Sequence, residues 1–400
     1  MVHYLYFGAT IPSFKFVSDF AHVTMSIFNQ KYKQPVLKKN QPDDTYKFQP
    51  LPAPTGEYPY RLDLTKIQQV PDVSKLAFHM LGDTGSIRNP DFQKLVVAEM
   101  IKQYQKTEDT GFEPQFLYHL GDVVYNFGEA SQYKRQFFDP YERYPGPIFA
   151  IPGNHDSDVN PDSRVRYSSL DAFRRVFCDT HPQTVPFSGN AARKSLVQPN
   201  VFWTLVTPVA NIIGLYCNVP KFGVITPDQR KWFMEELRHA DSERPGKAII
   251  LCMHHAPYSA DVNHGSSLNM IRFLDGVFEQ VGIRPDVVFS GHVHNYQRFS
   301  KKFHDGKVVP FVVAGGGGYD ELHPVANTSD SRFTPNNALF NHVKLENYCD
   351  TKHGFLKILI EKTVTGVTIT GEFYTLPHEK HVGPEMKADL ADRFVIKTGG

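Results

Sequence analysis

Two histidines stand one residue apart in the segment GHVHNY, at positions 291–296. The segment follows an apolar run that ends near Phe289, so we expect a strand that leads into a glycine turn. Alternate residues of an extended chain point the same way, so His292 and His294 would face one spot. Two neutral imidazoles that converge can share a metal cation. For an isolated H-x-H pair, the alternative is a turn with two solvated histidines.

Four other segments place ligand-type side chains after apolar, strand-like runs. They are GDTG, GDVVY, GNHD and MHH, which carry Asp83, Asp122, Tyr125, Asn154, His155 and His254. Glycine precedes the key residue in four of the five segments, counting GHVH. Glycine lets the chain leave a strand sharply and lets the backbone approach a bound ion. Each segment alone is a weak signal, but the ordered set predicts one shared site.

Seven of these side chains offer carboxylate, amide, phenol and imidazole donors: Asp83, Asp122, Tyr125, Asn154, His254, His292 and His294. This is more than one ion needs, and it suits two ions that share a bridging carboxylate. Without a thiolate, the set favours Fe, Mn, Zn, Mg or Co. A phenol ionises at neutral pH only when a highly charged cation displaces its proton, which trivalent iron does best. Alternatively, Tyr125 is an ordinary core aromatic residue.

Three other histidines and one cysteine are expected to have structural roles rather than a role in the site. His79 and His119 lie within predicted strands and are expected to be satisfied interior histidines. His323 follows a glycine run and is expected at the surface. Cys252 shares a strand with the MHH segment, where a small buried filler is the favoured role.

Alternating strands and helices predict sheets with helices outside them. Strand-like runs cover 75–81, 114–120, 146–151, 247–253, 285–290 and 308–314, and helical patterns cover 90–106 and 226–240. A hairpin is expected to turn near Thr365 and Gly366. Ligands in such folds gather beyond the carboxyl ends of the strands. That is where the five segments fall.

Residues 1–75 differ from the rest and are predicted to form an N-terminal extension. An amphipathic helix is expected over 16–28, and a Pro-rich irregular connection over 49–60. The helix could lie on a membrane or a partner, but packing against the chain's own core is favoured. We assign 76–375 to the main domain and 376–400 to a C-terminal tail.

The whole sequence of 400 residues is that of an ordinary globular protein, with a formal net charge of +1. Such a charge gives no reason to expect nucleic acid as a partner. No apolar segment is long enough to span a bilayer. The four scattered cysteines and the absence of a clear signal peptide favour the cytoplasm slightly, with secretion possible if the start is processed. No oligomeric state is indicated.

The ordered set GDxG, GDxxY, GNH[DE], xxxH and GHxH resembles the calcineurin-like metallophosphoesterases. The tyrosine in the second motif resembles the purple acid phosphatase type, and GDVVYNFGE with the downstream NHG is similar to its compact, tartrate-resistant style. The resemblance covers about 76–375. It implies an α/β (α+β) fold, a four-layer α/β/β/α sandwich with two mixed sheets.

The resemblance also implies roles for single residues. Asp83, Tyr125 and His294 would hold the first metal, usually Fe(III), and Asn154, His254 and His292 a divalent Fe, Zn or Mn, while Asp122 would bridge the two ions. His155 and His264 would stand beside the substrate, and His255 would be an extra. Gln297 stands where many relatives have glutamate.

The implied reaction is hydrolysis of a phosphomonoester, from a small molecule or a phosphorylated substrate, by a metal-bound hydroxide. Phosphodiesters or pyrophosphates are the alternative substrates, and a non-catalytic scaffold of the same fold is a further alternative. His155 would protonate the leaving alkoxide. Asp156 would either hold that imidazole or face water.

Overall fold

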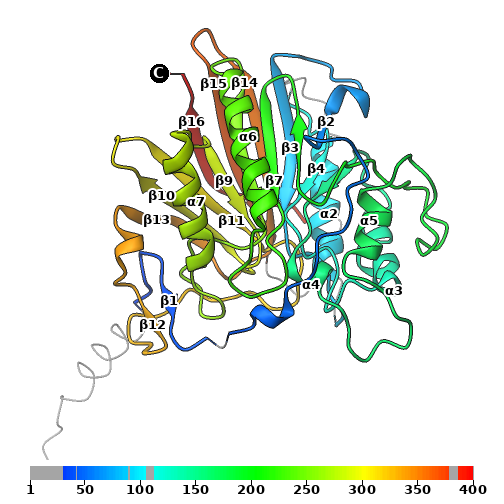
Figure 1. Cartoon of the computed structure of the whole chain (residues 1–400), viewed down its shortest axis with the longest axis horizontal. Helices are drawn as coiled ribbons and strands as arrows, with labels where there is room; N and C mark the ends of the chain where they lie inside the picture. The colour runs from blue at the N-terminus through cyan, green and yellow to red at the C-terminus, as the bar shows by residue number, and fades with distance from the viewer. Residues whose placement is uncertain (1–29, 42, 89–90, 105–111, 378–385, 400) are drawn as a thin grey trace, which may run out of the picture.

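Two large β-sheets packed face to face, with helices on their outer sides, form the centre of the molecule (Figure 1). The computed structural model describes residues 30–41, 43–88, 91–104, 112–377 and 386–399. The predicted four-layer α/β/β/α arrangement is confirmed. The predicted helix over 16–28 lies outside the described residues. Among the described helices, none combines the length and apolar character needed to cross a bilayer.

The larger sheet has eight strands. Their order is β13 (Val343–Cys349), β10 (Tyr296–Lys302), β11 (Val308–Ala314), β9 (Val287–Ser290), β8 (Ala248–Met253), β7 (Ala210–Leu215), β6 (Trp203–Val206) and β2 (Arg61–Asp63). The central strands β11, β9, β8 and β7 are parallel. Helices α6 (Pro227–Ser242) and α7 (Leu268–Val281) cover the outer face of this sheet (Figure 1).

The second sheet has six strands, in the order β16 (Asp389–Lys397), β15 (Val367–Thr375), β14 (Gly354–Lys362), β3 (Lys75–Leu81), β4 (Leu117–His119) and β5 (Ile148–Ala150). Strands β3, β4 and β5 are parallel, and the others pair antiparallel. Helices α2 (Asp91–Tyr104), α3 (Ala130–Tyr133) and α5 (Asp171–Phe177) lie on the outer side of this sheet. The predicted hairpin is confirmed as β14 and β15.

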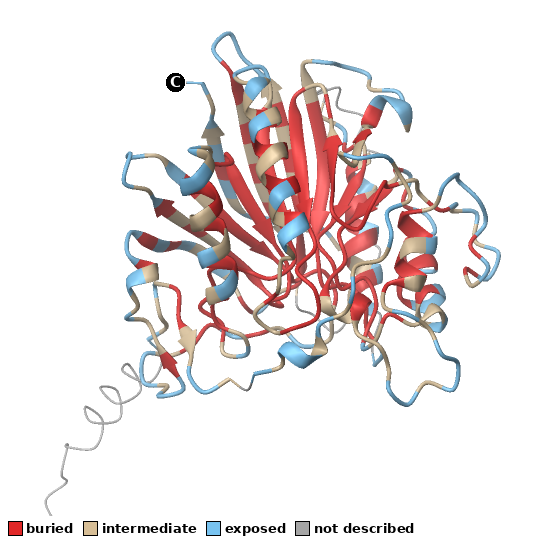
Figure 2. Cartoon of the chain, viewed as in Figure 1, coloured by how far each residue is buried: buried red, intermediate tan, exposed pale blue. Residues whose placement is uncertain are grey.

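Side-chain alternation along the strands explains the layers. In β8, Ile250 and Cys252 pack between the two sheets, whereas Ile249 and Leu251 pack toward the outer helices. Both sets are buried, as Figure 2 shows for the whole sheet centre. Strands covered on both faces are therefore continuously apolar. Cys252 is the small interior residue that the sequence predicts.

Local signals fix the ends of the outer helices. The side chain of Thr226 accepts a hydrogen bond from the backbone N–H of Gln229 and caps α6, which has Pro227 in its first turn. Ser267 caps α7 in the same way, and Gly282, with a φ of 71°, ends it in the left-handed conformation. These caps orient α6 and α7 on the sheet that carries the histidine segments.

Two segments, one before and one after the predicted main domain, each add an edge strand to one of the sheets. Arg61–Asp63 pairs with β6, and Asp389–Lys397 pairs with β15, although both lie outside the predicted 76–375 range. The connection over 49–60 is irregular, as expected. A small two-stranded sheet joins β1 (Leu37–Lys38) to β12 (Phe333–Thr334). The other short elements are η1 (Thr45–Lys47), η2 (Leu64–Lys66), η3 (Lys134–Phe138), α4 (Asn154–Ser157) and η4 (Ala338–Phe340).

Candidate metal centre

The five predicted segments meet at one edge of the sandwich. They follow β3, β4, β5, β8 and β9, and within each sheet these strands are parallel and end at the same side. The seven predicted ligand side chains consequently lie in one buried or half-buried cluster. Their meeting is a fact of the fold, whereas their role as ligands remains a prediction.

The first group of donors contains Asp83, Tyr125 and His294. The phenolic oxygen of Tyr125 lies 3.2 Å from Oδ1 of Asp83 and 3.1 Å from Nε2 of His294. That Nε2 is 3.6 Å from Oδ1 of Asp83. Nδ1 of His294 donates to the carbonyl of Glu321 at 3.1 Å, which leaves the Nε2 lone pair directed at the group.

The second group contains Asn154, His254 and His292. Nε2 of His254 lies 3.1 Å from Oδ1 of Asn154 and 3.3 Å from Nδ1 of His292. Nδ1 of His254 donates to the carbonyl of Leu120 at 2.8 Å. Lone pairs of His254 and Asn154 therefore face each other, an arrangement that requires a proton or a metal cation between them.

Asp122 stands between the two groups. The Oδ2 atom of Asp122 is 3.3 Å from Nε2 of His254, and the negative charge of Asp122 raises the pKa of the buried Tyr125 phenol further. The backbone N–H of His155 donates to its Oδ1 at 2.9 Å. Ligand atoms of Asp122, His254 and His292 all lie within 4.8 Å of one another. A carboxylate in this position can contact ions on both sides.

The electrostatics of the cluster show why it would attract cations. Burial, and then the charge of Asp122, raise the pKa of Asp83 well above its ordinary value. Burial also acts to raise the pKa of Asp122, but the His254 and His155 charges hold it below its ordinary value. Burial lowers the pKa of His254, yet the charge and hydrogen bond of Asp122 outweigh this and raise it to about 9.

Burial and the neighbouring charges of Asp122 and Asp83 raise the pKa of Tyr125 well above its ordinary value. The phenol therefore stays protonated unless a strongly charged cation takes the place of its proton. Nε2 of His292 is buried and has no hydrogen-bond partner among the described residues. The convergent O and N donors without thiolate fit hard or borderline metal ions.

The backbone is shaped for close approach at the centre. Asp83, Asp122 and His292 adopt left-handed φ values of 58°, 54° and 68°. Non-glycine residues rarely adopt this conformation, although Asp and His do so more often than most, and strained residues of this kind cluster at functional sites. At Gly153, a Cβ atom would lie 2.0 Å from Oδ1 of Asp122. The glycine before Asn154 thus gives the Asp122 carboxylate its space.

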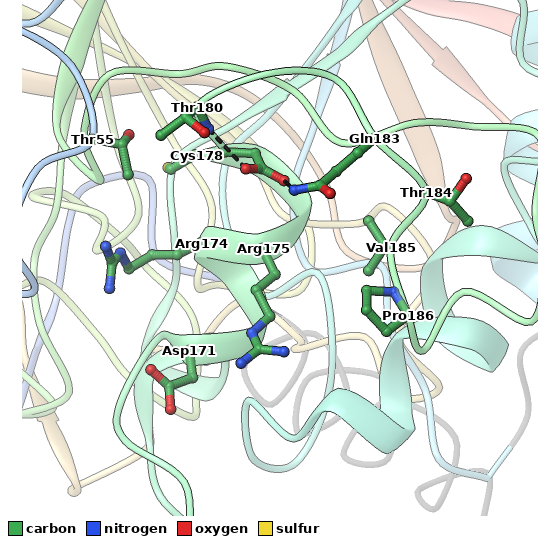
Figure 3. Close-up of a pocket in the computed structure, with 11 residues that line it drawn as sticks. Thr55, Asp171, Arg174, Arg175, Cys178, Thr180, Gln183, Thr184, Val185 and Pro186 are labelled. Carbon is green, nitrogen blue, oxygen red and sulfur yellow. Dashed lines mark hydrogen bonds between the residues drawn. The ribbon is translucent and has the colours of Figure 1, made fainter.

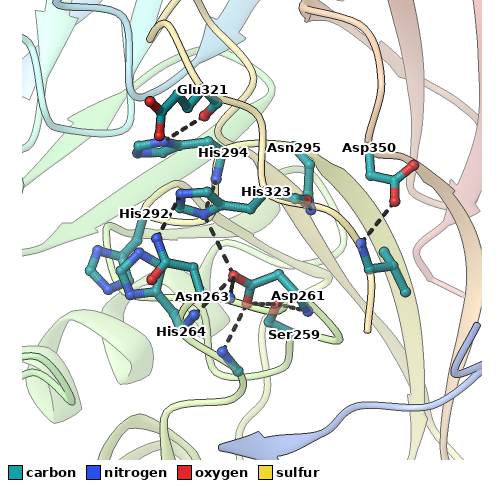
Figure 4. A network of polar contacts seen from close by, with 12 residues as sticks. Ser259, Asp261, Asn263, His264, His292, His294, Asn295, Glu321, His323 and Asp350 are labelled. Atoms are coloured by element: carbon teal, nitrogen blue, oxygen red, sulfur yellow. Dashed lines mark hydrogen bonds and ion pairs between the residues drawn. The ribbon is translucent and has the colours of Figure 1, made fainter. Parts of the chain in front are cut away.

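A cavity of about 150 Å³ opens beside the cluster, and both predicted substrate-facing histidines, His155 and His264, line it. The half-buried His155 donates from Nδ1 to the carbonyl of Asn126 at 2.7 Å, so its Nε2 is the ring nitrogen left for a ligand. The ring of His264 lies 4.1 Å from that of His292 (Figure 4). The other lining residues are Asp122, Tyr125, Asn263, His292, His294, Tyr319, Glu321 and His323.

The loop after β11 supplies three cavity residues that the sequence interpretation missed: Tyr319, Glu321 and His323. The prediction that His323 lies at the surface is wrong, because its ring is buried and stacks on that of His294 at 4.1 Å. A signal was present. The glycine run at 315–318 follows a parallel strand that ends at the same edge as β8 and β9.

Several other interpretations have clear outcomes. His79 and His119 are satisfied interior histidines, with partners in Tyr144 and Gln103 and in Thr84 respectively. Asp156 does not hold the His155 imidazole. Instead it is buried and accepts hydrogen bonds from the backbone N–H groups of Gly153, Val123 and Val124. Its carboxylate therefore joins two of the ligand loops.

Gln297, which stands where many relatives have glutamate, accepts from the backbone N–H of Ala260 and donates to the side chains of Ser259 and Asn295.

A larger hollow of about 370 Å³ lies beside α5, lined among others by Thr55, Arg174, Arg175 and Gln183 (Figure 3). It contains none of the predicted site residues.

The chain belongs to the calcineurin-like phosphoesterase family. The family model matches residues 77–296, which is more than half of the 400 residues and includes every predicted metal ligand. The resemblance inferred from the motifs is thereby confirmed.

Similar curated proteins are plant phosphatases. The Fe(3+)-Zn(2+) purple acid phosphatase 12 of Arabidopsis thaliana is 30% identical over 149 residues, covering 36% of this chain and 28% of that protein. A phosphoenolpyruvate phosphatase of Allium cepa is 27% identical over 237 residues, covering 57% and 42%. The chain thus spans less than half the length of these relatives. A solved dimetal phosphatase from Danio rerio aligns with a TM-score of 0.44 at 10% identity, covering 80% of this chain and 98% of that one.

Proposed function

We propose that this protein hydrolyses phosphate monoesters with two metal ions held by the seven clustered side chains. The observation that carries the proposal is the pair of donor groups on either side of Asp122, which are Asp83, Tyr125 and His294 on one side and Asn154, His254 and His292 on the other. The likeness to a plant Fe(3+)-Zn(2+) purple acid phosphatase supports Fe(III) in the first group and Zn in the second, where the motif resemblance also allows divalent Fe or Mn.

Bound cations would supply an activated hydroxide and charge neutralisation for the phosphoryl oxygens. The chain's own residues do the rest. The Leu120 and Glu321 carbonyls fix the tautomers of His254 and His294, so both present Nε2 to the cluster. His155, oriented by the Asn126 carbonyl, donates a proton from Nε2 to the leaving alkoxide.

Elemental analysis of protein purified without added metal, followed by titration of the metal-free protein with iron and a divalent ion, tests the proposal. We expect two ions per chain and turnover of p-nitrophenyl phosphate. Asp122→Asn should lower both the ion count and turnover. Asp286→Asn is the matched control, because Asp286 is also buried but lies away from the site. It pairs with Arg244 and accepts from the backbone N–H of Ile249, near the start of β8. Two bound ions without turnover of any phosphate ester would favour the scaffold alternative.

A further inference from the structure

A buried carboxylate outside the seven predicted ligands organises one wall of the cavity. Asp261 is completely buried and accepts hydrogen bonds from Oγ of Ser259 at 2.8 Å and from three backbone N–H groups. These belong to Asn263 at 2.8 Å, His264 at 2.9 Å and Gly265 at 2.8 Å. One side chain thus closes the whole loop that carries Asn263 and His264 to the cavity (Figure 4).

The same carboxylate reaches a second wall. Oδ2 of Asp261 lies 3.5 Å from Nδ1 of His323, which belongs to the loop after β11. His323 stacks on His294, while His264 packs 4.1 Å from His292. Nε2 of His323 is also 2.9 Å from the side-chain nitrogen of Asn263. Asp261 therefore connects two imidazoles that come from separate loops and border the two donor groups.

Residues 36–41 contact this loop from its other side. The carbonyl of Val36 accepts from the backbone N–H of Ser266 at 2.8 Å. Nζ of Lys38 donates to the carbonyl of Asn263 at 2.9 Å, and Nε2 of Gln41 donates to that of His264 at 2.8 Å. Few rotations remain for a loop that is fixed on both sides.

We propose that Asp261 is a positioning residue that, partly through His323, fixes Asn263 and His264 around the cavity, where their N–H groups hold the oxygens of a phosphoryl group. The inference rests on the proposed function for its substrate. It adds Asn263 to the groups that contact that substrate, and it gives His323 and the segment 36–41 a role as supports. A preorganised wall binds an anion more tightly than a mobile one, because binding then causes little further loss of conformational entropy.

Steady-state kinetics of the metal-loaded full chain with p-nitrophenyl phosphate tests the proposal. Asp261→Asn keeps the side-chain shape but places an amide where the carboxylate accepts from several N–H groups. We expect KM, and the inhibition constant of inorganic phosphate, to rise on the order of tenfold, with a smaller change in kcat and an unchanged metal content. Asp286→Asn should lower the melting temperature without raising KM.

A double-mutant cycle separates positioning from general stability. If Asp261 acts partly through His323, Asp261→Asn should raise KM less in a His323→Gln background than in the wild-type chain. Independent effects in this cycle, or a KM for Asp261→Asn that matches the wild type, would overturn the proposal.

Histidine ring NMR of the metal-free chain gives a readout that does not depend on catalysis. Asp261→Asn should shift the ring signals of His264 and His323 and leave those of His79 in place, because His79 contacts only distant residues. Unshifted signals would contradict the proposal. If instead the metal-loaded wild type turns over no ester while these signals still shift, the proposed function fails and the positioning role of Asp261 survives.

Discussion

The phenolic oxygen of Tyr125 lies 3.1 Å from Nε2 of His294, the atom that this histidine turns inward because its Nδ1 donates to the Glu321 carbonyl. A second acceptor, Oδ1 of Asp83, lies 3.2 Å from the same phenol. One phenolic proton cannot satisfy both neighbours at once. A cation at this point would replace the proton and bind all three side chains.

Tyr125→Phe should therefore bleach the visible absorption of the oxidised iron-loaded protein, because only a phenolate on Fe(III) gives the charge-transfer colour expected from the purple acid phosphatase resemblance. The fold should persist, since phenylalanine fills the same buried space. Visible and circular dichroism spectra measure the two effects. Tyr319→Phe is the matched control, because the centre of the Tyr319 ring lies 4.4 Å from that of Tyr125 although Tyr319 does not belong to the donor set. A colourless wild-type iron protein would rule out the iron–tyrosinate assignment and leave the family membership intact.

His155→Ala should slow hydrolysis far more for alkyl phosphates than for p-nitrophenyl phosphate. A poor leaving group needs the proton that His155 would donate, and such general acid catalysis contributes about 10²–10⁴-fold. An activated aryl leaving group needs it much less. Comparing kcat for the two substrates checks this, with the exposed His304→Ala as the control. Equal losses on both substrates would remove His155 from the acid role.

His79→Gln should flatten the pH dependence of stability in the metal-free protein. Burial lowers the pKa of His79 from 6.5 to about 3, while the imidazole accepts from Tyr144 and donates to Gln103. Between these two pH values the unfolded chain binds a proton that the native chain does not, so stability falls on acidification by about 1.4 kcal/mol per pH unit for this residue.

Urea unfolding at several pH values from 6.5 downward measures that slope. The variant should be less stable overall near neutral pH, because glutamine fills the site less well, but it should lose less stability on acidification than the wild type. An identical slope in both proteins would show that His79 is protonated in the native state or that other groups control the acid transition.

The sequence predicted the centre of the site because its information is local. Each of Asp83, Asp122, Asn154, His254 and His292 follows a short apolar run, and the parallel strands of one sheet end at one edge. The strands themselves were visible for the same reason, since those buried on both faces are continuously apolar.

The contacts that build the outer wall of the site could not be predicted, because they join distant segments, although His264 was predicted and the glycine run at 315–318 marked the loop after β11. Asp261 and His323 are 62 positions apart and meet only because the loops after β8 and β11 lie side by side. No periodicity or motif encodes such a contact. The strands Arg61–Asp63 and Asp389–Lys397 were missed for a related reason, since each is an edge strand whose pairing depends on a partner far along the chain.

Gly153→Ala should reduce metal binding without a loss of backbone stability large enough to unfold the protein. The φ and ψ of Gly153, −91° and −174°, suit any residue, so alanine fits the local dihedral angles. Its Cβ, however, would lie 2.0 Å from Oδ1 of Asp122 and 2.4 Å from the Asp122 backbone nitrogen, so the carboxylate and the loop that carries it must both shift. Because Asp122 stands between both donor groups, we expect a lower ion count by elemental analysis and a loss of turnover.

Gly276→Ala is the matched control. Gly276 lies within α7 with no atom closer than 3.6 Å to the added Cβ, so this change should raise stability by about 0.5–1 kcal/mol and leave the ion count unchanged. A Gly153→Ala protein that binds two ions as tightly as the wild type would show that the Asp122 carboxylate does not bridge them.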